Sequence, residues 1–433
     1  MTTAQELDTA ETELLALFPE VSGITADGEL TIGGCSVVDL AQRFGTPSYL
    51  MDEVGLRRQI RRFIDGLAIR WPNSEVIFAS KSLPCVAMYA IARSEGLSVD
   101  VAGGGELVMA LAAGVDPGRI YLHGNAKSDA EITMALNAGV AGIIVDNFND
   151  LDRLDRLATA EQGILIRMIP GISARTHASQ ATGGHESKFG LPVDQLRAAI
   201  GRVRESPLLR LDGIHVHVGS QILGTDQFVE AVESVAALGP FAAYDIGGGL
   251  GVAYTDSESA PTVDEYLDAV TEAARRLLPR GAKLMIEPGR AIVARAGVTL
   301  YTVNTVKKTG KTFVAVDGGM ADNLDIALTG QRYEAVVANK MSLPRAVVSD
   351  VVGRQCESGD LLVGPVNLAD PQVGDLIAMP VTGAYAYTLA NNYNGALIPP
   401  IIFCANGVAR VGAERQGYDD LLRLHQPALE GPW

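Results

Sequence analysis

Eight short runs of apolar and β-branched residues recur between residues 76 and 287, and stretches of helical length separate them. Regular alternation of this kind predicts parallel strand–helix–strand units. Eight such units favour a closed (β/α)8 barrel over an open doubly wound sheet, which is the competing architecture. The expected strands are Val76–Ser80, Leu97–Val101, Ile120–His123, Gly142–Val145, Ile164–Ile169, Gly213–Val218, Tyr244–Ile246 and Leu284–Glu287.

The pattern changes after Ala294, where strand-like runs alternate with glycine and proline and few long helical patterns occur. These runs predict a mostly antiparallel β domain. The segment Leu30–Ile32 can add a strand to it, and the helical stretch Glu53–Leu67 can precede the first barrel strand. We therefore expect a barrel over residues 48–295 and a β-rich domain formed by residues 1–47 and 296–433.

Composition excludes several classes of function. The chain has 433 residues, of which 47% are hydrophobic, so sizeable cores are possible. Its net charge of −16 disfavours nucleic acid as a partner, because phosphate binding requires a basic surface. The sequence shows no apolar run of membrane-spanning length, no signal-peptide pattern and no Cys-x-x-Cys pair among its four cysteines. We expect a cytoplasmic protein without a membrane partner or a metal site.

Two motifs suited to a phosphorylated aldehyde follow expected strands. Lys81 stands at the end of the first strand, and barrel active sites lie at these strand ends. Its amine can form a Schiff base, although an ordinary surface lysine is the simpler alternative. The triplet Gly247, Gly248 and Gly249 lets backbone N–H groups approach an anion, or merely forms a tight turn. Val252 replaces the third glycine of a dinucleotide fingerprint.

Histidine and carboxylate side chains follow two further strands. His215 and His217 alternate along a strand and should share a face, but no third metal ligand lies at a typical spacing. An imidazole can instead stack on an aromatic ring, and Ser220 can bind phosphate. Glu287 can keep a pyridine nitrogen protonated, and Arg290 can bind phosphate, unless the two form a structural ion pair.

Two residues of the β-rich region complete the set. Cys356 lies in a polar, glycine-containing segment, where a thiol can act as a general acid, although most lone cysteines are buried. Tyr385 can bind phosphate or belong to a core. A lysine, a ring partner, a phosphate cradle, a carboxylate and a thiol are the parts needed to bind and use pyridoxal 5′-phosphate.

These motifs occur in the order found in a known family. The chain resembles the alanine-racemase-fold (fold type III) family of pyridoxal-phosphate-dependent decarboxylases, and specifically its diaminopimelate-decarboxylase-like members, from about Pro47 to Val411. Further similar stretches are His123–Lys127, Ser187–Gly190 and Asp317–Met320.

The resemblance implies a role for each site residue. Lys81 forms the Schiff base with the cofactor and His217 stacks on its ring, while Cys356 returns a proton to the substrate. The phosphate is held by Ser220, Gly247, Gly248 and Gly249, the ring nitrogen by Glu287, and the remaining contacts are supplied by Arg290, Glu357 and Tyr385. In this family Cys356 and Glu357 serve the partner subunit, which implies a homodimer with shared active sites.

One segment departs from the family pattern. Diaminopimelate decarboxylases have an arginine and a tyrosine that grip the distal carboxylate of the substrate, where this chain has Asp325 and Thr329. Residues 391–398 also lack the usual arginines. An aspartate would repel a carboxylate, at a cost of roughly several kcal/mol if buried. We therefore expect a substrate without a free distal carboxylate.

Several substrates and functions stay open. The far end of the substrate can carry an amine that pairs with Asp325, or be attached to a carrier protein. Alternatively, Arg332 takes over the carboxylate and the substrate is meso-diaminopimelate. A catalytically silent regulator would not need both Lys81 and Cys356, and a racemase would typically use a tyrosine instead of this cysteine motif.

Overall fold

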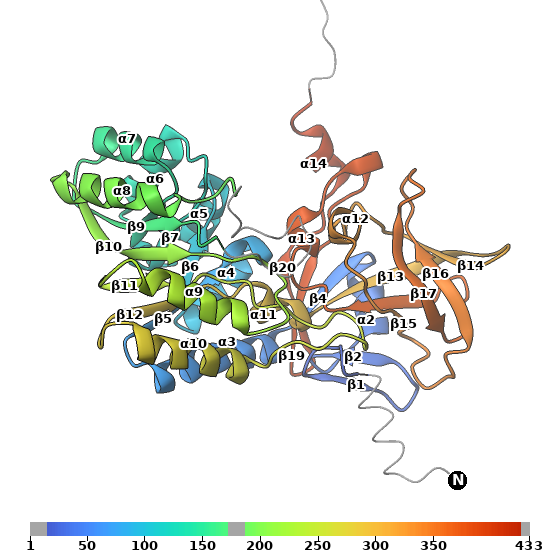
Figure 1. The fold of residues 1–433 in the computed structure, drawn as a ribbon. Coiled ribbons are helices and arrows are strands. Elements are labelled where there is room, and N and C mark those ends of the chain that lie inside the picture. The colour runs from blue at the N-terminus through green and yellow to red at the C-terminus, as the bar shows by residue number, and fades with distance from the viewer. Residues whose placement is uncertain (1–14, 172–186, 426–433) are drawn as a thin grey trace, which may run out of the picture. The chain divides into compact units, whose positions relative to one another are not determined.

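The computed structural model describes residues 15–171 and 187–425. The chain forms two compact units, Leu56–Ala294 and the segments that flank it (Figure 1). The strand β4 (Ser48–Asp52), which the sequence placed with the barrel, belongs to the flanking unit because it pairs with two strands there, β13 (Gly297–Lys308) and β19 (Ile401–Ala405). Among the described residues, no helix is both long and apolar enough to cross a membrane.

The unit Leu56–Ala294 is a closed parallel barrel of eight strands, as expected. All eight apolar runs identified in the sequence are strands, with bounds that differ by a few residues. The strands are β5 (Ser74–Ala79), β6 (Ser98–Val101), β7 (Ile120–Leu122), β8 (Gly142–Val145), β9 (Gln162–Met168), β10 (Leu209–Val216), β11 (Ala243–Asp245) and β12 (Lys283–Ile286).

Helices follow or connect these strands and cover the barrel (Figure 1). The helix α3 (Glu53–Arg70) precedes the first strand, as the sequence predicted. The others are α4 (Val86–Ser94), α5 (Gly104–Ala112), α6 (Asp129–Ala138), α7 (Phe148–Leu157), α8 (Val193–Glu205), α9 (Asp226–Ala236), α10 (Val263–Leu277) and α11 (Arg290–Val293).

The barrel interior changes from apolar to ionisable along the strands. A buried apolar cluster contains Ile77, Tyr121, Ile144, Leu165, Ala243 and Met285. Side chains alternate between the two faces of a strand, so the residue two positions later points into the interior one level higher. Five of those next-level residues are ionisable and buried: His123, Asp146, Arg167, Asp245 and Glu287. These five side chains lie at the carboxyl ends of the strands, where barrel enzymes have their active sites.

The flanking unit contains a nine-stranded mixed sheet and a separate three-stranded sheet. Most pairs in the large sheet are antiparallel, but β14 (Thr312–Val316) pairs in parallel with β16 (Val347–Val352), and β19 does so with β4. The segment Leu30–Ile32 is strand β2, as expected, but it pairs with β1 (Ser22–Ile24) and β3 (Cys35–Ser36) and adds nothing to the large sheet. The remaining strands are β15 (Val336–Val337), β17 (Leu361–Leu368), β18 (Leu376–Pro380) and β20 (Val408–Ala413).

Candidate active site

Lys81 lies on a short 3-10 turn, Ser80–Ser82, directly after β5, and its side chain is exposed. Hydrogen bonds fix this turn on both sides. The Ser80 N–H donates to Asp100 Oδ1 at 3.0 Å, and Ser82 Oγ donates to the Ala79 carbonyl at 2.8 Å. Burial raises the pKa of Asp100 and lowers that of His217, and the positive charge of Lys81 acts to lower both. Lys81 therefore stands on a fixed turn, and its charge acts on these two side chains.

The triple glycine turn lies against His217. The Gly248 N–H donates to His217 Nδ1 at 3.1 Å, and the Gly247 N–H donates to Asp245 Oδ1 at 2.9 Å. A Cβ atom on Gly248 would lie 2.1 Å from the Glu287 carbonyl oxygen, and one on Gly249 would be as badly placed. The glycines thus allow the backbones at the ends of neighbouring strands to approach each other closely. This is the tight-turn role that was one of the two alternatives for the triplet.

His217 is an uncharged imidazole at neutral pH. Burial is the main cause that lowers the pKa of His217 well below its usual value, and the positive charges of Lys81 and Arg167 act in the same direction. Because Nδ1 accepts the Gly248 bond, the hydrogen of the neutral ring is on Nε2. A neutral, oriented imidazole is suited to stack on an aromatic ring.

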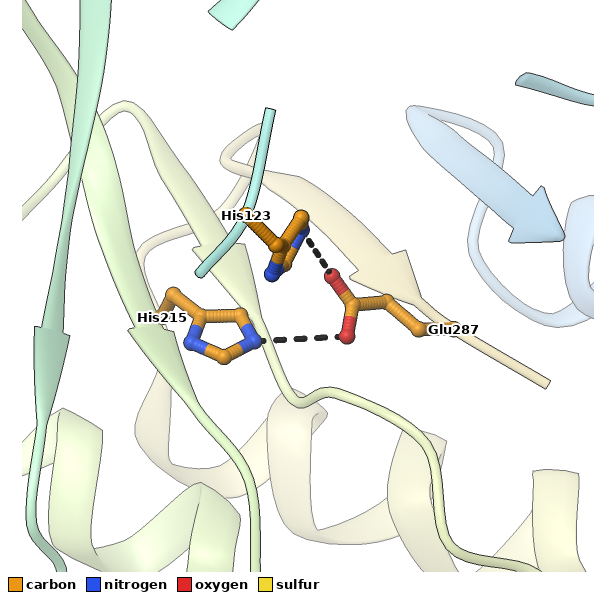
Figure 2. Close-up of side chains that lie close together, drawn as sticks. All are labelled: His123, His215 and Glu287. Carbon is orange, nitrogen blue, oxygen red and sulfur yellow. Dashed lines mark hydrogen bonds and ion pairs between the residues drawn. The ribbon is translucent and has the colours of Figure 1, made fainter. Parts of the chain in front are cut away.

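Glu287, which follows β12, contacts two histidines from other strands of the barrel, His123 after β7 and His215 in β10 (Figure 2). His123 Nε2 lies 3.0 Å from Glu287 Oε1, and His215 Nε2 lies 3.3 Å from Oε2. The two imidazole rings meet edge to face with centroids 5.2 Å apart. Burial acts to raise the pKa of Glu287, but the histidines outweigh it and lower this pKa well below its usual range. Glu287 is therefore a buried, ionised carboxylate.

A buried arginine supplies positive charge close to a hydroxyl group. Arg290 Nη2 donates to Ser220 Oγ at 3.3 Å, and Nη1 donates to the hydroxyl of Tyr254, over whose ring the guanidinium lies. An arginine and a serine hydroxyl together suit a phosphate or carboxylate group. Ser220 and Arg290 were predicted from their motifs, but Tyr254 was not, and its position five residues after the glycine triplet was the available signal.

The barrel brings together an ionisable residue from every strand end, and the sequence analysis identified only some of them as site residues. Burial raises the pKa of Asp100 to about 6 and that of Asp245 well above its usual value. The available signal was the alternation rule, which places a charged residue two positions beyond an inward apolar one. The full set is Lys81, Asp100, His123, Asp146, Arg167, His215, Asp245 and Glu287.

The flanking unit holds the other expected site residues on three loops that hydrogen bonds tie together. Asp360 accepts the N–H groups of Met320 at 2.7 Å and Gln355 at 2.8 Å, which joins the loops on either side. The Cys356 N–H donates to Asn394 Oδ1 at 3.0 Å. The hydroxyl of Tyr393 donates to the side chain of Glu357. Cys356 and Glu357 are exposed, so the Cys356 thiol is accessible.

Tyr385 has a strained backbone at the beginning of α13 (Ala386–Leu389). Its φ is +66°, in the left-handed region that residues other than glycine rarely adopt. Such conformations cost of order 1–3 kcal/mol and cluster at functional sites. The role of Tyr385 at the cofactor stays a prediction.

Asp325 begins the short helix α12 (Asp325–Thr329) and is 3% exposed. The hydroxyl of Tyr333 donates to Asp325 Oδ2 at 3.1 Å, and Thr329 Oγ1 donates to the Asp325 carbonyl at 2.7 Å. Within the described residues no lysine, arginine or histidine forms an ion pair with Asp325. Arg332, the alternative group for a distal carboxylate, is exposed.

The barrel side chains fit pyridoxal 5′-phosphate by their chemistry. They provide an exposed amine, a neutral imidazole, a buried ionised carboxylate and an arginine beside a hydroxyl group. These match an aldehyde, an aromatic ring, a protonated ring nitrogen and a phosphate, respectively.

Comparison with known proteins gives the same result. Residues 55–294 match the model of the pyridoxal-dependent decarboxylase family, pyridoxal binding domain. The chain is 44% identical to a diaminopimelate decarboxylase of Actinosynnema pretiosum subsp. auranticum, with 92% of each chain covered, and 38% identical to that of Bacillus subtilis, with 93% of this chain and 97% of the relative covered.

A solved structure agrees with these relatives. The diaminopimelate decarboxylase of M. jannaschii in complex with L-lysine matches with a TM-score of 0.87 and 28% identity, over 94% of this chain and 98% of that one. The chain therefore belongs to the fold type III family of pyridoxal-phosphate-dependent decarboxylases and is a carboxy-lyase whose cofactor is pyridoxal 5′-phosphate.

Proposed function

We propose that this enzyme decarboxylates an amino acid whose far end carries no free carboxylate. The observation that carries the proposal is Asp325, a buried carboxylate that accepts a hydrogen bond from Tyr333 and has no ion-pair partner among the described residues. A second carboxylate beside it would be repelled and left unpaired. The ammonium group of a diamino acid would supply the countercharge. An aminoacyl group on a carrier protein is the other substrate without a free distal carboxylate.

The residues of the barrel would hold the cofactor and orient it. Lys81 would form the covalent link, neutral His217 would lie on the ring, and Glu287 would face the ring nitrogen. Ser220, Arg290 and the glycine triplet would hold the phosphate. When bound, pyridoxal phosphate accepts the electron pair released as carbon dioxide leaves. The exposed thiol of Cys356 would then return a proton to the α-carbon, and Glu357, oriented by Tyr393, would contact the substrate.

We also propose that the enzyme is a homodimer in which Cys356 and Glu357 serve the partner subunit's site. Their exposure supports this proposal. We expect inactive Lys81→Ala and Cys356→Ala variants to regain about a quarter of wild-type activity when subunits are mixed and allowed to exchange. Half of the dimers would then be mixed, and each would contain one intact site. Activity that stays at the level of the separate variants, with subunit exchange shown by native mass spectrometry, would contradict the shared site.

Release of carbon dioxide from a panel of substrates tests the proposed substrate class. We expect turnover of lysine, ornithine or carrier-bound amino acids to exceed that of meso-diaminopimelate, because only the latter places a carboxylate beside Asp325. The names of the relatives favour meso-diaminopimelate as the second candidate. Rapid turnover of free meso-diaminopimelate would refute the proposal and establish that candidate. Release from no substrate, with cofactor bound, would favour the silent regulator.

A further inference from the structure

Glu287 has both carboxylate oxygens engaged by different imidazoles, which is more than an ordinary structural ion pair requires (Figure 2). All three side chains are buried: Glu287 is 4% exposed, His123 is 8% and His215 is 1%. Burial favours the neutral form of a carboxyl group. Hydrogen bonds donated to the charged form oppose this effect, and each N–H donor contributes more where water is excluded.

His215 acts on Glu287 as a hydrogen-bond donor and carries no charge of its own at neutral pH. Burial lowers the pKa of His215 to about 4. The neutral ring has one N–H, and Nε2 is the atom that faces the carboxylate, so the hydrogen is on Nε2. The other nitrogen, Nδ1, is buried and has no hydrogen-bond partner among the described residues.

The surrounding structure holds both imidazoles in place. The backbone N–H of His123 donates to the Val101 carbonyl at 2.8 Å. Buried Lys127 donates to the carbonyls of Gly124 and Ile144 and pairs with Asp150 at 2.7 Å, which fixes the loop after His123. His215 lies within strand β10, in register with Arg167 on one side and Asp245 on the other.

We propose that His123 and His215 are positioning residues that keep Glu287 ionised and so keep the proton on the ring nitrogen of the bound cofactor. This inference rests on the proposed role of Glu287 opposite that nitrogen. If the donors were removed, the buried carboxyl group would take the proton itself, and the ring would lose its positive charge. A neutral ring is a weaker electron sink. The other ionisable groups of the same level are Lys81, Asp100, Asp146, Arg167 and Asp245.

A divalent metal ion is the competing occupant of this cluster. The ligand atoms of His123, His215 and Glu287 lie within 4.8 Å of one another, and two imidazoles with a carboxylate are common ligands of zinc. The nitrogen atoms, however, each approach a different oxygen at hydrogen-bonding distance. The His215 contact is a hydrogen bond, whereas the His123 Nε2 and Glu287 Oε1 atoms lie 3.0 Å apart without hydrogen-bond geometry among the described residues. The metal content of the holoenzyme is therefore measured as part of the test.

The test uses holoenzyme loaded with pyridoxal phosphate that carries 15N in the ring. In the wild type we expect the 15N NMR shift of a protonated ring nitrogen. In His123→Leu, His215→Leu and the double variant, the shift should move toward the unprotonated value, and decarboxylation should fall roughly ten- to a hundredfold per lost donor. Glutamine at either position places an N–H donor near Nε2 and should restore most of the shift, whereas the shorter asparagine should not. His425→Leu, at an exposed histidine, should change neither quantity.

The outcomes separate this inference from the proposed function. A protonated ring nitrogen in the leucine variants, as in the wild type, would overturn the inference alone. An unprotonated nitrogen in the wild type would overturn the role of Glu287 on which it rests. Stoichiometric zinc in the wild-type holoenzyme, lost in His123→Leu, would overturn the hydrogen-bonding role in favour of a metal site.

Discussion

Replacing Lys81 with alanine should remove the yellow colour of the purified protein and lower decarboxylation by roughly three orders of magnitude or more, as expected when a covalent catalytic group is lost. Lys81 is exposed directly after a barrel strand, whereas Lys127 is buried and pairs with Asp150. The fold should persist, because the turn is held by backbone groups and by Ser82, and the Leu83 N–H donates to the Ser80 carbonyl at 2.9 Å. Absorbance near the Schiff-base band and carbon dioxide release measure the two effects.

Lys308→Ala is the matched control, because Lys308 is exposed on β13 and lies outside the barrel. It should keep both colour and activity. A Lys81→Ala protein that still forms an imine with pyridoxal phosphate, shown by borohydride reduction and peptide mapping, would assign the covalent link to another amine. That result would leave the assignment of pyridoxal phosphate as the cofactor intact and would refute only the assignment of Lys81 as the residue that binds it covalently.

The barrel could be predicted because most of its strands are buried on both faces. Such strands are continuous apolar runs in a sequence, and their alternation with helices has few structural solutions. Strands β17 and β20 had weaker signals. β17 is interrupted by Gly364-Pro365, and β20 is largely exposed. The pairing of β4 with β13 and β19 joins segments far apart in the chain, which no local pattern indicates.

The candidate site was predicted where its residues stand in short motifs. Lys81, the glycine triplet and Glu287 stand in short motifs, and each of them follows a strand of the barrel. His123, Asp245 and Arg167 were missed as site residues because a single ionisable residue at a strand end resembles any loop residue. Their role depends on strand register, which places Arg167, His215 and Asp245 side by side. Similarly, the bond from Tyr333 to Asp325 depends on how the chain turns after α12.

Restoring the family's pair of residues, Asp325→Arg with Thr329→Tyr, should raise kcat/KM for meso-diaminopimelate by roughly a hundredfold. The change replaces a repulsive carboxylate with a cation, and removing one partner of a buried charge pair typically costs about 2–5 kcal/mol. Both positions lie on α12, one helical turn apart, so the two side chains can act on one substrate group. Turnover of the preferred substrate should fall, because Asp325 no longer supplies a countercharge.

Asp325→Asn separates the loss of repulsion from a failure to fold. The amide keeps the shape of the carboxylate and can still accept the hydrogen bond from Tyr333, but it carries no charge. We expect this variant to lose most activity toward a diamino substrate and to gain a smaller part of the meso-diaminopimelate activity. If carrier-bound amino acids are the substrate, their turnover should be nearly unchanged, because they present no ammonium group to Asp325. Folded Asp325→Asn and double variants whose relative turnover of all three substrate types equals that of the wild type would show that Asp325 does not contact the far end of the substrate.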